Sequence, residues 1–420
     1  MPDSFFELAM TNAMSLYQQA SLKKAIEYGE KALNIAEKAG DITNFLRALE
    51  MLMGLYFETG DDEQVLDAAQ TIINASLVVL DDDASNILGQ SFLCSAYTGI
   101  GRVARKQLDF EKAREYLLQR YNVTYNWLYK PSDSIRPLSL KKFLHASSCE
   151  HLCEMFIFLN DKDNSMIYSQ EYANLTTELV KEDAESVQYQ LLYIMAFYCL
   201  GKSYYLADKL DEAMHNLTVA LSASTAMGQG LPNSFEFAGT HLVILETLGE
   251  FSEKQQDYEK ALGYYNEQFI ITKKFHLINK FNVDTTFNHG NAACKLADIN
   301  IKLDKLDDAL PYLQQIEEIF TVLTADPNAG LSHFHELYYG YATFIDYYQK
   351  KGDWTLALKY ANKTVHTLEK MVEMVENDPN FRPRYTRLLR QYLNKAAKIC
   401  ETMDDKPMAR KFEARANAVK

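Results

Sequence analysis

The stretch "YCLGKSYYLADKLDEAMHNLTVAL" (residues 198–221) returns in altered form as "ACKLADINIKLDKLDDALPYLQQI" (residues 293–316). Each copy has a small residue beside an apolar one, a short polar turn, the motif Leu-Asp-(Asp/Glu)-Ala and a second apolar stripe. This pattern is typical of two short amphipathic helices joined by a tight turn. We therefore expect a helix pair to be the repeated building block of the chain.

The alanine of the Asp-Glu-Ala motif, Ala213, marks a position that recurs along the chain. The equivalent residues are Ala25, Val65, Ala113, Ser165, Ala213, Ala261, Ala309, Ala357 and Ala409. Twelve residues before them stand Ala13, Met53, Gly101, Cys153, Gly201, Gly249, Ala297, Ile345 and Ala397, of which six are Gly or Ala. Such small residues let the second helix come close to the first. Self-similarity of this kind predicts a solenoid.

This register, clearest in "LGEFSEKQQDYEKALGYY" (residues 248–265), resembles the tetratricopeptide repeat, although Met53, Val65, Ser165 and Ile345 depart from its small residues. The resemblance covers the chain from about Phe5 to Lys420. It implies an all-α fold, a right-handed α-solenoid of stacked antiparallel helix pairs forming one array over residues 1–420. The expected units are roughly 5–40, 44–82, 86–130, 138–182, 186–228, 233–276, 282–324, 332–377 and 382–420.

The distances between anchors predict unusually long helices. Successive anchors are 40, 48, 52, 48, 48, 48, 48 and 52 residues apart, whereas the common tetratricopeptide period is about 34 residues. A surplus of about 14 residues is close to four helical turns, or two for each helix. Whole turns keep the apolar face in place, so we expect helices of about 18 to 22 residues.

Turn chemistry agrees with these helix positions. Asp109, Asp257 and Asp353 stand where second helices begin, and a carboxylate there accepts hydrogen bonds from free N–H groups of the first turn. Pro311 is expected in the first turn of its helix, where its missing N–H costs little.

Composition excludes several classes of partner and compartment. With 43 Lys and Arg against 57 Asp and Glu, the net charge is −14, which argues against nucleic acid or an anionic membrane as a partner. No apolar run is long enough for a membrane span, and the N-terminus is unlike a signal peptide. Six cysteines in 420 residues form no disulfide framework. We expect a cytoplasmic protein.

One cluster has the spacing of a metal site. "HASSCEHLC" places His145, Cys149 and Cys153 on one helical face, with His151 adjacent, and such a ladder could hold zinc. Both cysteines also occupy apolar positions of the register, and buried cysteine behaves as a small hydrophobe, which is the favoured interpretation. "HFHE" (residues 333–336) lacks the paired histidines of a zincin. No phosphate loop, nucleophile elbow or redox motif is present. We expect no metal, no cofactor and no catalytic residues.

In tetratricopeptide-like arrays the first helix of each unit lines the concave surface, and the resemblance implies which side chains face the groove. They are Arg102, Arg105, Lys106, Tyr198, Lys202, Tyr205, Asn288, Asn291 and Tyr339, followed by Asp298 and Asp346. The cations suit a partner's carboxylates, the asparagines a peptide backbone, and the tyrosines offer rigid apolar area. The alternative is that these are ordinary solvated residues that pair with one another.

Three functions compete. The first is a non-enzymatic scaffold that binds a protein or peptide segment in its groove. The second is a sensory module that resembles bacterial Rap-type peptide-pheromone receptors; their N-terminal effector part is not expected in this chain, because the first unit begins at Phe5. The third is an enzyme with acid and base groups converging in the groove. The carboxylate clamp of tetratricopeptide co-chaperones is not expected either, because Met10 and Met14 stand at its positions.

Overall fold

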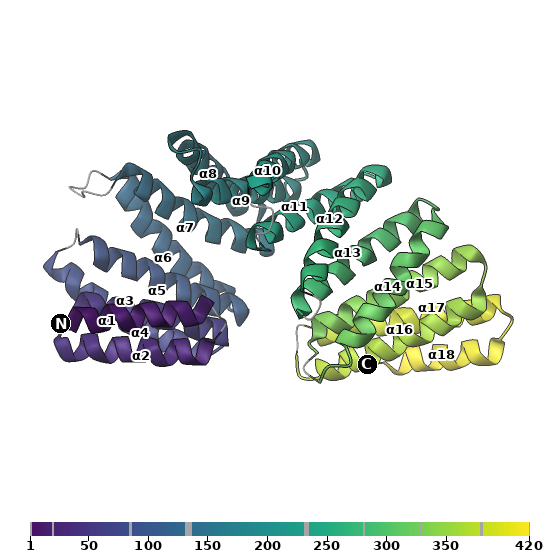
Figure 1. The fold of residues 1–420 in the computed structure, drawn as a ribbon. Helices are drawn as coiled ribbons and strands as arrows, with labels where there is room; N and C mark the ends of the chain where they lie inside the picture. Colours follow the sequence, from purple (N-terminus) through teal and green to yellow (C-terminus); the bar gives the residue numbers. More distant parts are fainter. Residues whose placement is uncertain are drawn as a thin grey trace. The chain divides into compact units, whose positions relative to one another are not determined.

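The structure is a computed structural model that describes residues 2–18, 21–83, 86–130, 137–230, 235–279, 282–327, 329–378 and 381–419. Within these ranges every regular element is an α-helix and no strand occurs (Figure 1). Consecutive helices pack in antiparallel pairs, so the predicted all-α solenoid of helix pairs is confirmed. The predicted start of the sixth unit, at residue 233, lies outside the described residues.

The chain divides into two compact units, Met1–Met227 and Gly228–Lys420. The helices of the first unit are α1 (Pro2–Gln18), α2 (Leu22–Ala39), α3 (Ile42–Thr59), α4 (Asp62–Asp82), α5 (Ile87–Lys106), α6 (Phe110–Tyr129), α7 (Leu138–Phe158), α8 (Lys162–Glu182), α9 (Val187–Leu206) and α10 (Leu210–Gly230), the last of which ends just past the boundary. Those of the second are α11 (Phe235–Lys254), α12 (Tyr258–Ile278), α13 (Val283–Lys302), α14 (Leu306–Leu323), α15 (Leu331–Lys351), α16 (Trp354–Met374), α17 (Arg382–Thr402) and α18 (Lys406–Ala418). Whether both units form one array stays a prediction.

The anchor residues lie where the paired helices meet. Ala213 is fully buried, as are its counterparts Ala113 and Ala261. The small residues twelve positions earlier face the second helix: a Cβ added to Gly201 would lie 2.7 Å from Cγ of Leu217 and 3.1 Å from the carbonyl oxygen of Ala213. At Gly201 a Cβ would therefore fit only if Leu217 moved away. The register of the sequence is therefore a packing requirement between the two helices of a pair.

From the α3–α4 pair to the α17–α18 pair, the turn between the two helices repeats one conformation. The residue two positions before the second helix has a positive φ, as in Leu108 (61°), Asp208 (58°) and Gly352 (74°). The backbone N–H of the following residue donates to a carbonyl oxygen in the last turn of the first helix, as from Asp109 to Ala104 at 2.9 Å. This hydrogen bond gives a partner to a carbonyl that has none within the helix. The predicted caps are present: Asp109, Asp257 and Asp353 accept from backbone N–H groups at 3.1, 3.2 and 3.0 Å.

The expected place of Pro311 was wrong. Helix α14 begins at Leu306 with Lys305 as its cap, so Pro311 lies in the second turn. Its missing N–H leaves the carbonyl of Asp307 without the usual intrahelical donor. The helix begins earlier than expected because the turn before it keeps the common conformation, with Asp304 at a φ of 62°.

First helices contact the first helices of neighbouring pairs within each unit. Helix α3 contacts α5 and α7 contacts α9 in the first unit, and α13 contacts α15 in the second. These helices therefore share one face in each unit, as expected for the groove-lining helices of this kind of repeat. In the part of the chain that the structure describes, no helix has the length and apolar content needed to cross a bilayer.

Candidate functional site: a basic aromatic pocket on first helices

The first unit carries a pocket of about 500 Å³ lined by α3, α5 and α7 and by Phe110 at the start of α6. Its lining combines three cations with three phenylalanines, a histidine and one carboxylate. The residues are Phe57, Arg102, Arg105, Lys106, Phe110, His151, Glu154 and Phe158. The three predicted cations of the third unit are thus brought together in one pocket, in a chain whose net charge is −14.

Arg102 is an exposed cation that rests on an aromatic ring. Its guanidinium lies over the ring of Phe57, 3.7 Å from the ring centre. Among the described residues no carboxylate forms an ion pair with it. Stacking of this kind holds the planar guanidinium in place while its N–H groups stay available at the edge. Arg102 is therefore oriented to donate to a carboxylate or carbonyl from outside the chain.

The other two cations of the pocket have partners within the chain. Arg105 pairs with Glu154 at 3.4 Å, and Lys106 pairs with Asp62 at 2.7 Å. The side chains of Arg105 and Lys106 are 32% and 49% exposed, and ion pairs in such positions contribute little to stability. A carboxylate from a ligand can replace Glu154 or Asp62 at small cost.

His151 adds a neutral polar group to the pocket wall. Burial, and after it the positive charges of Arg120 and Arg105, hold the pKa of His151 well below its usual range. The imidazole is therefore uncharged at neutral pH, and one ring nitrogen donates while the other accepts. On the same helix but outside the pocket lining, burial and the neighbouring Glu154 raise the pKa of Glu150 to about 7. The pocket thus combines the neutral imidazole of His151 with charged side chains and with the apolar surface of the phenylalanines.

The remaining predicted groove residues lie elsewhere. Tyr198, Lys202 and Tyr205 share α9, where Lys202 Nζ lies 6.0 Å from the centre of the Tyr198 ring. The others belong to the second unit, where Asn288 and Asn291 are half-buried on α13.

Tyr339, on α15, is already engaged within the second unit. Its hydroxyl donates to Asp298 at 3.2 Å. Burial raises the pKa of Tyr339 far above its usual value, with Asp298 adding to the effect. Asp298 also pairs with Lys302 at 2.7 Å. Tyr339 therefore agrees with the alternative given in the sequence analysis, in which a predicted groove residue pairs with another residue of the chain.

Sequence reasoning missed the aromatic and acidic members of the pocket. Glu154 follows Cys153 as Arg102 follows Gly101, so the repeat register alone could have found it. Phe57, Phe110 and Phe158 sit at three different places in the register. Only the packing of three helices brings them together, so no signal within one repeat identifies them.

A second cluster surrounds His145, which is fully buried. Its Nδ1 lies 2.9 Å from Oγ1 of Thr124, and its Nε2 lies 3.0 Å from Oε1 of Glu171 on α8. The rings of three α6 tyrosines have their centres close to the imidazole centre, at 4.8, 5.8 and 5.6 Å for Tyr121, Tyr125 and Tyr129. This arrangement fixes the orientation of the imidazole.

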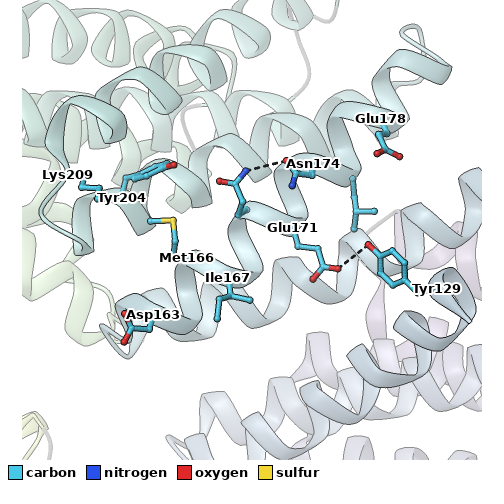
Figure 2. A pocket seen from close by; sticks show the side chains of 11 residues that line it. Tyr129, Asp163, Met166, Ile167, Glu171, Asn174, Glu178, Tyr204 and Lys209 are labelled. Atoms are coloured by element: carbon cyan, nitrogen blue, oxygen red, sulfur yellow. Dashed lines mark hydrogen bonds between the residues drawn. The ribbon is translucent and has the colours of Figure 1, made fainter.

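Glu171 is the centre of the polar contacts in this cluster. Its carboxylate accepts from the hydroxyl of Tyr121 at 2.7 Å and from that of Tyr129 at 3.2 Å. Burial alone raises the pKa of Glu171, but hydrogen bonds from His145 and Tyr121 outweigh it and hold the value below its usual range. Glu171 and Tyr129 also line a pocket of about 900 Å³ on α8, and Figure 2 shows Tyr129 reaching Glu171 at its edge.

The predicted cysteine ladder separates in the structure. Cys149 lies in the His145 cluster, where one ligand atom from each of His145, Cys149 and Glu171 lies within 4.8 Å of the others. Cys153, one turn on, donates from its Sγ to the carbonyl oxygen of Glu150 at 3.1 Å. The third member of the cluster is therefore Glu171 on the next helix, which the sequence pattern did not indicate.

No family model and no curated protein matches the sequence. Solved structures do match. One is aspartyl phosphate phosphatase F from Bacillus subtilis, at 12% identity over 99% of this chain and 94% of that chain, with a TM-score of 0.54. Another is the apo quorum sensor NprR from B. thuringiensis, at 12% identity over 99% and 98% of the two chains, with a TM-score of 0.51.

A third match is a signal transduction ATPase with a tetratricopeptide repeat sensor from Pyrococcus horikoshii, at 16% identity and a TM-score of 0.52. The match covers 94% of this chain and 52% of that one, so the chain spans about half the length of that protein. Identities this low show the fold alone. The chain has the tetratricopeptide-type helical repeat fold that the sequence predicted.

Proposed function

We propose that the chain is a non-enzymatic scaffold that binds an acidic, aromatic- or leucine-containing protein segment in the pocket of α3, α5 and α7. The observation that carries the proposal is the placement of Arg102, stacked at 3.7 Å over Phe57 with its polar edge free of a carboxylate partner among the described residues. An exposed oriented cation beside apolar walls suits a carboxylate followed by an apolar side chain.

The chemistry of the pocket defines the ligand further. Arg102, Arg105 and Lys106 supply charge-assisted donors, while Phe110 and Phe158 supply the apolar surface. His151, being neutral, can donate to or accept from a peptide amide. These groups position a segment without activating it.

The test is a binding titration by fluorescence anisotropy. The probes are two labelled peptides with a central Phe, one rich in Asp and Glu and one in which Lys replaces those acids. We expect the acidic peptide to bind at least about tenfold more tightly, and Arg102→Ala with Lys106→Ala to remove about tenfold or more of that affinity. Arg410→Ala, at an exposed position on α18, is the matched control. Equal binding of both peptides, or an unchanged affinity in the double variant, contradicts the proposal.

The second candidate is a sensory module whose array closes around a signalling peptide. It is supported by the fold likeness to a quorum sensor and to an ATPase with a repeat sensor. The acidic peptide separates the two candidates in solution scattering. A sensor shows a smaller radius of gyration when the peptide is added, whereas a rigid scaffold keeps the same value.

A further inference from the structure

We propose that His145, Cys149 and Glu171 form a transition-metal site of the zinc type, with a fourth coordination position that opens toward the pocket beside Glu171. One ligand atom of each residue lies within 4.8 Å of the others. A tetrahedral zinc ion with these ligands needs separations of about 3.4 to 3.8 Å, so small side-chain rotations bring the atoms into place. The site is independent of the peptide pocket on α3, α5 and α7.

The surroundings orient two of the ligands as a metal site requires. The contact of 2.9 Å between Thr124 Oγ1 and Nδ1 of His145 directs Nε2 toward Glu171. The hydroxyl of Tyr121 donates to Oε2 of Glu171 at 2.7 Å, and that of Tyr129 donates to Oε1 at 3.2 Å, which fixes the carboxylate. Oε1 also lies 3.0 Å from Nε2 of His145, so a metal would bind by replacing this contact between the two ligand atoms. Outer contacts of this kind fix ring orientation and carboxylate geometry in metal sites.

The donor set selects the metal. A thiolate, an imidazole and one carboxylate suit Zn²⁺ or Co²⁺ and disfavour Mg²⁺ and Ca²⁺, which take oxygen ligands. His145 and Cys149 are fully buried, while the Glu171 side chain is 21% exposed at the edge of the pocket of about 900 Å³. The metal enters from that side and a water completes the tetrahedron. Binding releases the thiol proton of Cys149 to solvent, so the sulfur coordinates as a thiolate. The proton on Nε2 of His145 moves to Nδ1, where Thr124 Oγ1 accepts its hydrogen bond, and Nε2 is then free to coordinate.

Cys153 provides an internal control. It lies one turn from Cys149 on the same helix and is equally buried, but its Sγ donates to the Glu150 carbonyl at 3.1 Å and it is not part of the cluster. A thiolate signal that depends on Cys149 and not on Cys153 identifies this site rather than any buried cysteine.

The experiment is titration of the full-length, reduced chain with Co²⁺, followed by absorption. We expect about one Co²⁺ per chain, with thiolate-to-cobalt charge transfer and the visible bands of tetrahedral cobalt, and displacement by Zn²⁺. Cys149→Ser should abolish the charge-transfer band, and Glu171→Gln should weaken binding by about tenfold or more. Cys153→Ser should leave both unchanged. Circular dichroism establishes that each variant is folded, and Cys149→Ala replaces Cys149→Ser if the latter is not.

Three results overturn the proposal. Cobalt binding without a charge-transfer band means that the metal sits on surface histidines or carboxylates. A band that persists in Cys149→Ser and disappears in Cys153→Ser places the metal at the other cysteine. Failure of the wild-type protein to bind any Co²⁺ also contradicts the site, because the three ligand atoms already lie close together.

Discussion

Gly249 on α11 lies directly against the ring of Tyr265 on α12, where a Cβ added to the glycine would fall 2.3 Å from Cε1. Tyr265 is itself fully buried, and its hydroxyl donates to Glu253 at 2.6 Å. The ring therefore has no room to move away. The close approach of the paired helices depends on this one missing methyl group.

Gly249→Ala should lower the free energy of unfolding by about 1–3 kcal/mol, because the new Cβ overpacks the helix interface. The matched control is Gly263→Ala on α12, where a Cβ meets nothing within 4 Å. That variant should gain about 0.5–1 kcal/mol from helix propensity. Urea unfolding of both variants checks the pair. A neutral or stabilising Gly249→Ala would show that the two helices are not held at this close distance.

The caps give a second prediction. Asp353 accepts a hydrogen bond from the N–H of Leu356 at 3.0 Å. Asp353→Ala removes the acceptor and should cost about 1 kcal/mol of stability. Asp353→Asn keeps an acceptor of the same size and should cost clearly less. Equal losses in the two variants, measured by thermal unfolding, would mean that the side chain acts through its charge and not as a cap.

Glu336 predicts how stability depends on pH. Burial raises its pKa to about 7, with Lys295 opposing and Glu246 adding to the shift, from an ordinary value of 4.5. Between these two values the folded state holds a proton that the unfolded chain has released. The free energy of unfolding therefore falls as pH rises through this window, by about 3 kcal/mol in total.

Glu336→Gln should remove this loss. The variant should match wild type at pH 5 and exceed its stability at pH 8, as measured by urea unfolding at both values. Glu413→Gln, at an exposed position on α18, should keep the wild-type dependence. A Glu336→Gln variant less stable than wild type at pH 8 would contradict the prediction, because ionised Glu336 would then be a favourable partner of Lys295.

The fold could be predicted far more completely than the site. Anchors such as Ala213 and small residues such as Gly201 repeat because each pair of helices meets in the same way, so one repeat predicts the next. The cations Arg102, Arg105 and Lys106 share one helix face, and helical spacing was enough to group them.

The other members of the sites come from separate helices at unrelated register positions. Phe57 stacks on Arg102 from α3, and Glu171 reaches His145 from α8. Such pairings depend on how successive helices are rotated and offset against one another, which hydrophobic periodicity does not specify. These two pairings could therefore be found only in the packed structure.

Salt should affect peptide binding in two opposite ways. The chain carries a net charge of −14, and at about 0.01 M salt its repulsion reaches about 30 Å. At about 0.1 M that range shrinks to about 10 Å, so the acidic peptide senses mainly the local cations. Its affinity should rise between these concentrations and fall toward about 1 M, where the pocket itself is screened. Affinity that rises steadily to about 1 M would show that apolar contacts alone hold the peptide.

Photo-cross-linking locates the bound segment and so tests the peptide pocket most directly. An acidic peptide with benzophenylalanine in place of its central Phe is irradiated with the chain, and the cross-linked residues are identified by mass spectrometry. We predict cross-links near Arg102, Phe110 and Phe158, suppressed by excess unlabelled acidic peptide. Cross-links confined to helices that do not line the pocket, or cross-links that excess peptide does not suppress, would contradict a binding site in this pocket.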